Sequence, residues 1–270
     1  MVYKMTGSGN DFVMVDGRAT TPAEWSPGDI QALCARGTGI GADGLVFVSP
    51  GADPGSARMT YFNNDGSHAA MCGNAALCSV RLAARLGLAP SSGMTLETDA
   101  GAYEARSPGE TERAELHLAA LAPPAPVRGL ALANGEHRAA LATVGVPHLV
   151  VLVDDVDTVD LAARGRALRF DPALGPAGAN VNYVSPAREA GRWRMRTYER
   201  GVEGETLACG TGSVAAACAL HDWGMAELPL SIVTRTGRLL GVQARKNSEG
   251  CYDDIWLSGE ARLVFRGVLT

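Results

Sequence analysis

The sequence lacks the patterns that identify most metal-binding, dithiol or membrane proteins. No Cys-x-x-Cys occurs among its six cysteines, so neither a zinc knuckle nor a thioredoxin-type dithiol is indicated. No window approaches the roughly 20 apolar residues of a membrane span. Residues 1–7 contain no apolar signal segment. These absences predict a cytoplasmic protein with no membrane partner.

An excess of positive charge is also missing. The 24 Lys and Arg residues are outnumbered by 29 Asp and Glu, which gives a formal net charge of −5 and a pI near 5.6. No Lys/Arg-rich run supplies a phosphate-binding patch, so the sequence argues against a nucleic-acid partner. A hydrophobic content of 46% is ordinary for a globular protein, and 270 residues allow one large domain or two of common size.

Two Cys-Gly turns stand out in what the sequence does contain. Cys72-Gly73 and Cys209-Gly210 lie about half the chain length apart, and each precedes an Ala-rich stretch that predicts a helix. The spacing from Tyr61 to Cys72 equals the spacing from Tyr198 to Cys209. The chain therefore repeats itself, with a period close to half its length.

Other residues follow the same repeat. Asp43 precedes Cys72 by the same spacing as Asn180 precedes Cys209, and Asn10 and His148 match in the same way to within one position. The repeat predicts two similar halves: residues 1–120, completed by about 258–270, and residues 121–257.

The predicted elements within each half are mostly short strands around one long helix. We expect helices over 26–36, 73–86, 159–168 and 211–221, hairpins over 94–105 and 230–242, and strands over 13–15, 45–48, 116–118, 149–153, 181–185, 194–198, 255–257 and 261–265. This pattern predicts an α+β fold with two pseudo-symmetric halves. Each half would be a curved, mainly antiparallel sheet wrapped around a central helix, with the active site in the cleft between the halves.

The two cysteines have the surroundings of acid–base groups. Only the thiolate is a useful base, and the amides and dipole at a helix N-terminus stabilise that anion. The same amides bind a carboxylate well, and the glycine after each cysteine lets a ligand approach the backbone. A single Cys-Gly would merely start a helix, but two in matching positions favour a pair of thiols on either face of one α-carbon.

The remaining cysteines suggest no chemistry. Cys34, Cys78, Cys218 and Cys251 are expected to be small buried hydrophobic residues. A disulfide is an unexpected use for any of them in a cytosolic chain of this size.

Glu199 and Arg200 form a candidate binding pair at the end of an expected strand. Adjacent strand residues face different ways, and the two suit an ammonium group and a carboxylate, respectively. The alternative is an ion pair at the surface.

Six motifs, taken in order, resemble diaminopimelate epimerase. They are Gly7-Ser8-Gly9-Asn10-Asp11-Phe12, Gly39-Ile40-Gly41-Ala42-Asp43-Gly44, Phe62-Asn63-Asn64-Asp65-Gly66-Ser67, Cys72-Gly73-Asn74, Tyr198-Glu199-Arg200-Gly201 and Cys209-Gly210-Thr211-Gly212. The resemblance runs from Tyr3 to Val268. It implies an isomerase that uses neither pyridoxal phosphate nor a metal, takes a small amino-acid substrate and forms a homodimer.

The resemblance also implies roles for individual residues. Cys72 and Cys209 would be the two acid–base groups in the conversion of LL- to meso-diaminopimelate, a step in lysine and peptidoglycan precursor biosynthesis. The turns Gly73-Asn74 and Gly210-Thr211 would hold the reacting end, and His148 and Glu199 would tune the cysteine pKa values. The residues expected to bind the far end of the substrate are Asn10, Asn63, Asn180, Glu199 and Arg200.

The chain departs from the usual family pattern in three places: Val146 where many members carry Asn, Gly44 where some carry Gln, and one extra residue within 201–206. Two other functions stay open at this point. One is a cofactor-independent racemase of proline or hydroxyproline, which has no far end for Glu199 and Arg200 to bind. The other is a non-catalytic redox thiol protein.

The first prediction concerns Arg200. Lys cannot reproduce the bidentate contact of Arg with a carboxylate. We therefore expect Arg200→Lys to lower kcat/KM for diaminopimelate by a factor that corresponds to roughly 2 kcal/mol or more of lost transition-state stabilisation. A solvated surface charge would change it by no more than about 0.5 kcal/mol, and that result would remove Arg200 from the binding residues.

Overall fold

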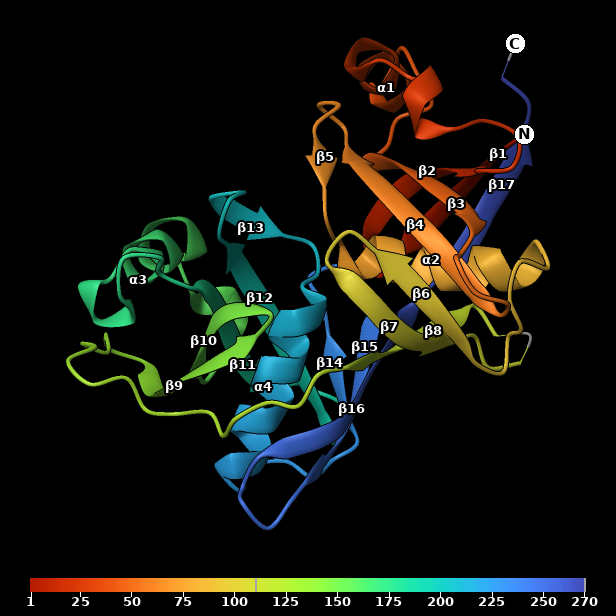
Figure 1. Cartoon of the computed structure of the whole chain (residues 1–270). Helices are drawn as coiled ribbons and strands as arrows, with labels where there is room; N and C mark the ends of the chain where they lie inside the picture. Colours follow the sequence, from red (N-terminus) through yellow and green to blue (C-terminus); the bar gives the residue numbers. More distant parts are fainter. Residues whose placement is uncertain (110, 270) are drawn as a thin grey trace. The chain divides into compact units, whose positions relative to one another are not determined.

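The protein consists of two compact units in a computed structural model that describes residues 1–109 and 111–269. One unit comprises Met1–His117 with Ser258–Thr270, and the other comprises Leu118–Leu257. They are called unit 1 and unit 2 below. Each is built from short strands and one long helix, as the colours along the chain in Figure 1 make easy to follow.

Unit 1 contains one long helix and a sheet that is mostly antiparallel. Its strands are β1 (Val2–Gly7), β2 (Asn10–Asp16), β3 (Gly44–Pro50), β4 (Ser56–Asn63), β5 (His68–Ala69), β6 (Met94–Thr98), β7 (Gly101–Arg106), β8 (Arg113–Leu118) and β17 (Arg262–Gly267). Its helices are η1 (Pro22–Glu24), α1 (Pro27–Cys34) and α2 (Gly73–Arg85). The strand order is β17-β1-β2-β3-β4-β6-β7-β8, with β5 also on β4; of these pairs, β2–β3 and β4–β6 run parallel and the others antiparallel.

Unit 2 repeats this plan. Its strands are β9 (Glu136–Val144), β10 (Val146–Val153), β11 (Asn180–Pro186), β12 (Arg192–Glu199), β13 (Gly204–Thr206), β14 (Leu230–Val233) and β15 (Leu239–Lys246), and β16 (Tyr252–Glu260) begins in it. Its helices are η2 (Val156–Thr158), η3 (Leu161–Gly165), α3 (Arg166–Arg169), η4 (Pro172–Leu174) and α4 (Gly210–Asp222). The order is β9-β10-β11-β12-β14-β15 with β13 on β12, and the parallel pairs are β10–β11 and β12–β14. The parallel pairs fall at the same places as in unit 1, so the predicted α+β fold with two pseudo-symmetric halves is confirmed.

The long helix of each unit is buried, because small side chains let it fit against the sheet. In α4 the stretch 212–220 is buried throughout, and alanines make up much of it. In α2 the run 74–80 is buried, and Arg85 is exposed at the helix end. A helix buried to this extent owes its stability mainly to the protein packed around it. This confirms the predicted central helix in each half.

Several local predictions are also confirmed. Ser26 is the N-cap of α1 and forms a capping box with Asp29. Gly87, after the C-cap of α2, has φ +67°, the left-handed conformation that glycine adopts without strain. Both predicted hairpins are present, as β6–β7 and β14–β15.

Other predictions are wrong or incomplete. The helix expected over 159–168 is instead a π-helical turn, η3, followed by the short helix α3. Asp160 caps η3 by accepting from the amide of Ala163, so the helix begins later than expected. Five strands were not predicted: β1, β4, β5, β9 and β13. Of these, β9 has an Ala-rich sequence with little intrinsic strand preference and is held by its pairing with β10.

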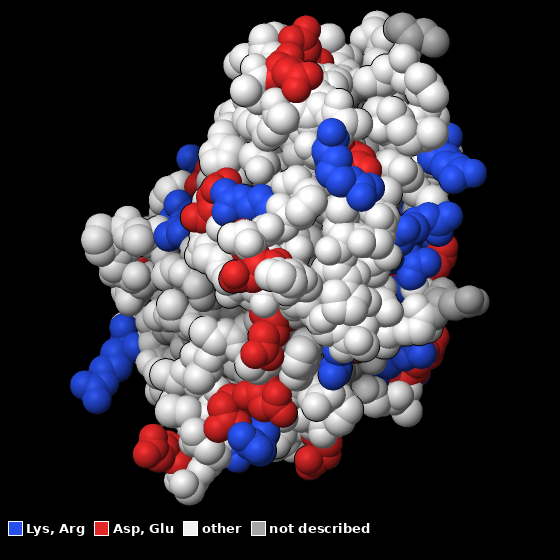
Figure 2. All heavy atoms as spheres, turned by 45° about the vertical axis from the view of Figure 1, so that its right-hand side comes forward, with Lys and Arg blue, Asp and Glu red and all other residues white. Residues whose placement is uncertain are grey.

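The surface carries charges of both signs. Figure 2 shows acidic and basic side chains interspersed on the face that it presents. Many are paired, as in the ion pairs Arg196–Glu205 and Arg106–Glu115. Within residues 1–109 and 111–269, no helix is both long and apolar enough to cross a membrane.

The burial of α2 leads to a stability prediction. Ala83 is fully buried, while its neighbour Ala84 is partly exposed. We expect Ala83→Leu to lower the free energy of unfolding by about 1–3 kcal/mol, because the sheet leaves no room for a larger side chain. Ala84→Leu, with the same change in helix propensity, should stay within about 0.5 kcal/mol. Urea unfolding of both variants provides the test; equal losses would contradict tight packing on one side of the helix.

Candidate active site

Each key cysteine is the N-cap residue of its unit's buried helix. Cys72 precedes α2 with φ −142° and ψ 119°, and Cys209 precedes α4 with φ −131° and ψ 107°. The first amides of an α-helix have no acceptor within the helix, and they carry the positive end of its dipole. The structure thus places both predicted cysteines, each with its Gly73-Asn74 or Gly210-Thr211 turn, where a thiolate and a bound carboxylate are stabilised.

The other cysteines differ from these two. Cys34, Cys78 and Cys218 are buried as predicted, while Cys251 is only partly buried. Burial raises the pKa of Cys34 to about 11 and that of Cys218 to about 12, and it raises the pKa of Cys78 further. These three thiols therefore stay protonated at neutral pH and are poor bases.

Gly212 allows the helix turn that follows Cys209 to pack closely against the Asn182 side chain. A Cβ atom on Gly212 would lie 2.3 Å from Asn182 Oδ1 and 3.1 Å from Cys209 Sγ. Cys209 Sγ is also 3.8 Å from the hydroxyl of Thr211. The first turn of α4 can therefore sit directly against β11 only because residue 212 has no side chain.

In unit 2, three predicted residues meet at one end of the sheet. His148 pairs with Asn180 in the parallel β10–β11 ladder, and the Asn180 side chain bridges to the segment after β12. Its Oδ1 accepts from the amide of Arg200 at 2.8 Å, and its Nδ2 donates to the carbonyl of Pro147 at 3.4 Å. Asn180 thus fixes where the chain turns after β12, a structural role beyond the predicted contact with substrate.

Two titratable groups here have shifted pKa values. His148 is fully buried, and desolvation together with the charge of Arg200 lowers its pKa to about 3, so the ring is neutral at physiological pH. Glu199, the last residue of β12, is partly buried, and desolvation raises the pKa of its carboxyl group.

In unit 1, a chain of amides begins at a carboxylate. The carboxylate of Asp43 accepts from Asn10 Nδ2 at 2.9 Å, from the Asp11 amide at 3.1 Å and from Arg36 at 2.8 Å. Asn10 Oδ1 then accepts from Asn74 Nδ2 at 2.7 Å. Because the carboxylate only accepts, it fixes the orientation of both amides and leaves Asn74 Oδ1 as a buried acceptor with no partner among the described residues.

Asp43 is not among the predicted site residues, although its spacing from Cys72 makes it part of the internal repeat. Its partner Arg36 also binds Asp11, which in turn binds the buried Lys4. Asn63, which was predicted, ends β4 opposite Gly44, and its Nδ2 donates to Ser67 at 3.0 Å. Asn63 therefore lies at the same end of the sheet as Asn10, and no hydrogen bond joins the two side chains within residues 1–109 and 111–269.

The register of the strands corrects the residue matching inferred from spacing. The tight turn before β2 consists of Ser8 and Gly9, whereas Gly145 alone precedes β10. The counterpart of Asn10 is therefore Val146, the first residue of its strand, and not His148. In the parallel ladders Phe12 pairs with Gly44 as His148 pairs with Asn180, so Gly44 rather than Asp43 corresponds to Asn180.

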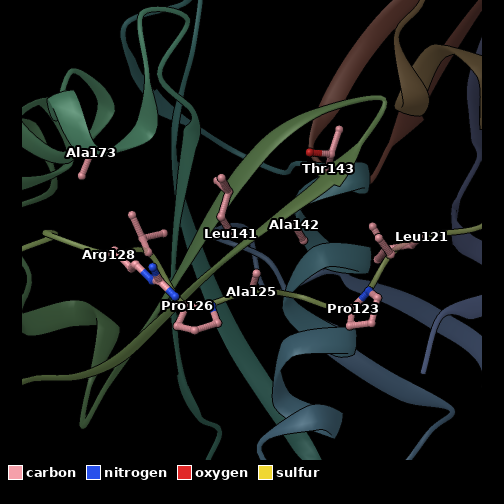
Figure 3. Close-up of a pocket in the computed structure, with 11 residues that line it drawn as sticks. Leu121, Pro123, Ala125, Pro126, Arg128, Leu141, Ala142, Thr143 and Ala173 are labelled. Carbon is pink, nitrogen blue, oxygen red and sulfur yellow. The ribbon is translucent and has the colours of Figure 1, made fainter. Parts of the chain in front are cut away.

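A pocket in unit 2 lies beside β9, whose Ala142 pairs with His148 of β10. It has a volume of about 350 Å³ and is lined by residues 121–123, 125–128 and 141–143 and by Ala173 (Figure 3). The lining is mostly apolar, Arg128 is its one charged residue, and it includes no predicted site residue. Among residues 1–109 and 111–269, no group of three His, Cys, Asp or Glu side chains is arranged to hold a metal ion.

Comparisons with known proteins agree with the resemblance seen in the motifs. The family model for diaminopimelate epimerase matches residues 2–117 and 140–262. A diaminopimelate epimerase of Gemmatimonas aurantiaca is 47% identical, covering 98% of this chain and 97% of that protein. One from Aquifex aeolicus is 36% identical, with 99% and 97% covered.

Solved structures share the fold at low identity. A Bacillus anthracis phenazine biosynthesis protein of the PhzF family has a TM-score of 0.73 at 17% identity and covers 98% of this chain and 96% of its own. A probable proline racemase from Agrobacterium radiobacter has a TM-score of 0.64 at 16% identity, with 96% and 89% covered. At such identities the likeness concerns the fold alone.

The amide chain in unit 1 gives the third prediction. Asp43→Asn replaces an obligate acceptor by a group that can also donate, so the orientation of Asn10 and Asn74 is no longer fixed. We expect kcat/KM for diaminopimelate to fall about tenfold, the scale of one hydrogen bond to a charged group. Asp16→Asn is the matched control, because Asp16 pairs with Arg18 and contacts neither amide. Equal activity of the two variants would show that Asp43 does not orient the amides.

Proposed function

This chain belongs to the diaminopimelate epimerase family, and on that basis we propose that it converts LL- to meso-diaminopimelate with Cys72 and Cys209 as its two acid–base groups. The chain is an isomerase of the epimerase type that acts on a small molecule. The observation that carries the mechanism is that both units place a cysteine at the N-cap of a buried helix.

The proposed reaction removes one proton from the α-carbon and adds another to the opposite face. The thiolate of one cysteine takes the α-proton, which breaks the C–H bond and forms an S–H bond. The thiol of the other cysteine gives its proton to the opposite face of the same carbon, and the inverted product leaves with no net change in charge or oxidation state. Two monoprotic groups suffice, so the step follows ordinary general acid–base logic.

Helix-start amides would stabilise the intermediate carbanion. Negative charge that develops at the α-carbon is delocalised onto the carboxylate, and donors already directed at that carboxylate need no reorganisation. We assign these donors to Gly73 and Asn74 in α2 and to Gly210 and Thr211 in α4. The buried acceptor Asn74 Oδ1 suits the ammonium group next to the same carbon.

The far end of the substrate would bind through side chains beside β10–β12 and β2–β4. Arg200 would hold its carboxylate and Glu199 its ammonium group, with Asn10, Asn63 and Asn180 as further polar contacts. Asn180 supports this assignment by fixing the backbone amide of Arg200. We further propose that His148 and Glu199 influence the proton affinity of the two thiols.

The biological setting follows from this function. We propose that the enzyme works without pyridoxal phosphate, as a homodimer in the cytoplasm, and that its product serves lysine and peptidoglycan precursor biosynthesis. The alternatives of a proline-type racemase or a non-catalytic thiol protein have less support, because the relatives at 47% and 36% identity are named diaminopimelate epimerases.

The two-thiol mechanism leads to the fourth prediction. We expect Cys72→Ala and Cys209→Ala each to lower kcat by at least about a thousandfold, because each removes one partner of the proton transfer. Proton NMR in heavy water, with LL- and meso-diaminopimelate and with proline as a control substrate, measures α-hydrogen exchange directly. Cys218→Ala, in the same helix as Cys209 but with a buried thiol of raised pKa, is the control and should keep its activity.

Two outcomes would contradict the proposal. Full turnover by either alanine variant at position 72 or 209 would rule out the two-thiol mechanism. Exchange on proline in place of diaminopimelate would instead contradict the proposed substrate.

A further inference from the structure

His148 has a buried ring nitrogen without a hydrogen-bond partner, which is uncommon in folded proteins. The residue is 0% exposed, and its Nε2 has no partner among the described residues. Its other ring nitrogen, Nδ1, lies 3.3 Å from the side-chain nitrogen of Asn182. Which ring nitrogen carries the proton determines whether Nε2 is a donor or an acceptor.

The orientation of Asn182 decides this question. Its side-chain nitrogen lies 3.3 Å from the carbonyl oxygen of Leu149 and 3.5 Å from that of Asn180. Backbone carbonyls only accept hydrogen bonds, so the NH2 group must face them. On the other side, Asn182 Oδ1 accepts from the hydroxyl of Thr197 at 2.9 Å.

The amide nitrogen that faces His148 can only donate, so a hydrogen bond between them requires that Nδ1 is the acceptor. A neutral imidazole with an accepting Nδ1 carries its proton on Nε2. Burial and the charge of Arg200 both lower the pKa of His148, so the ring stays neutral. Asn182 and Thr197 are themselves almost fully buried, so solvent cannot compete for these bonds.

We propose that Asn182 is a positioning residue that holds His148 as the Nε2–H tautomer, so that His148 acts as a hydrogen-bond donor and not as a base. This inference rests on the proposed function, because it assigns a role to His148 within that reaction. A neutral N–H donor stabilises a nearby anion, such as a thiolate or a carboxylate, without taking its proton. The close approach of Gly212 to Asn182 Oδ1 links this arrangement to the first turn of α4, where Cys209 lies.

The tautomer can be measured directly on the unaltered protein. Two-bond proton–nitrogen NMR of the ¹⁵N-labelled enzyme distinguishes a protonated from an unprotonated ring nitrogen, and the spectrum of His148→Gln identifies the His148 signals among those of five histidines. We expect an unprotonated Nδ1 and a protonated Nε2 at every pH from about 5 to 8, since the pKa lies well below that range. A proton on Nδ1, or titration near an ordinary histidine pKa, would overturn the proposal.

Two further variants test whether Asn182 is responsible. Asn182→Leu removes the donor to Nδ1 at similar volume, and we expect a mixture of tautomers in the same spectrum. Thr197→Val removes only the hydroxyl behind Asn182 and should leave the Nε2–H form dominant. Unchanged tautomers in Asn182→Leu would show that another group holds the ring; should that variant not fold, the spectrum of the unaltered protein still decides the tautomer.

Activity separates a donor from a base. Gln can place an N–H near the position of Nε2, whereas Asn is too short. If His148 is a donor, His148→Gln should keep a kcat about tenfold higher than that of His148→Asn, whereas loss of a base would disable both alike. The tautomer measurement needs no substrate. An enzyme with the expected spectrum and no exchange on diaminopimelate would therefore contradict the proposed function while leaving the role of Asn182 intact.

Discussion

Both halves of this protein depend on a helix that is buried over most of its length and begins at a partly exposed turn. The buried runs of α2 and α4 start at Asn74 and Gly212, whereas Gly73 and Gly210 are partly exposed. The amides at those turns still need acceptors, because an unsatisfied buried donor costs about 1–3 kcal/mol. A helix that ends its buried run at a cysteine and a glycine therefore presents amides and a sulfur atom to an anionic ligand together. The same packing that stabilises each unit thus creates the electrostatic conditions for thiolate chemistry.

Groups that can only accept hydrogen bonds fix the orientation of the asparagine side chains at both sites. An asparagine amide is nearly symmetric in shape, so shape alone does not decide which end faces a ligand. In unit 1 the carboxylate of Asp43 fixes the orientation of Asn10, and Asn10 in turn fixes that of Asn74. In unit 2 two backbone carbonyls fix the orientation of the Asn182 amide, and Asn182 in turn fixes the tautomer of His148. One unit thus offers a buried acceptor and the other a buried donor, each fixed by neighbours that cannot reverse their roles.

Much of this was accessible from the sequence, and the remainder depended on strand register. The internal repeat, the helix starts at Cys72 and Cys209 and the two glycine turns are visible in the sequence itself, and they predicted the α+β halves correctly. Spacing alone mismatched Asn10 with His148, because the segments between each strand start and its cysteine differ in length by one residue: Asn10 lies 62 positions before Cys72, and its counterpart Val146 lies 63 before Cys209. The orientations of Asn74 and Asn182 were not predictable either, since they depend on partners from other strands. The helix expected over 159–168 shows the same limit: the segment is helical over 161–169, but it begins later than expected, after the Asp160 cap, and its first turn is π-helical.

The corrected matching indicates how two similar halves came to differ chemically. The position of the buried His148 is held in unit 1 by Phe12, which is equally buried and apolar, and that of Asn180 is held by Gly44. Unit 1 has instead an ionic cluster of Lys4, Asp11, Arg36 and Asp43 close to its amide chain. An enzyme that inverts one centre of a substrate must treat its two faces differently while the second centre stays unchanged. If substrate and product were mirror images of each other, identical surroundings for both thiols would suffice. A substrate with a second centre that stays L is not the mirror image of its product, so the forward and reverse reactions are inequivalent. The two units differ at their strand starts and agree at their helix starts, which suits the proposed substrate with one fixed centre.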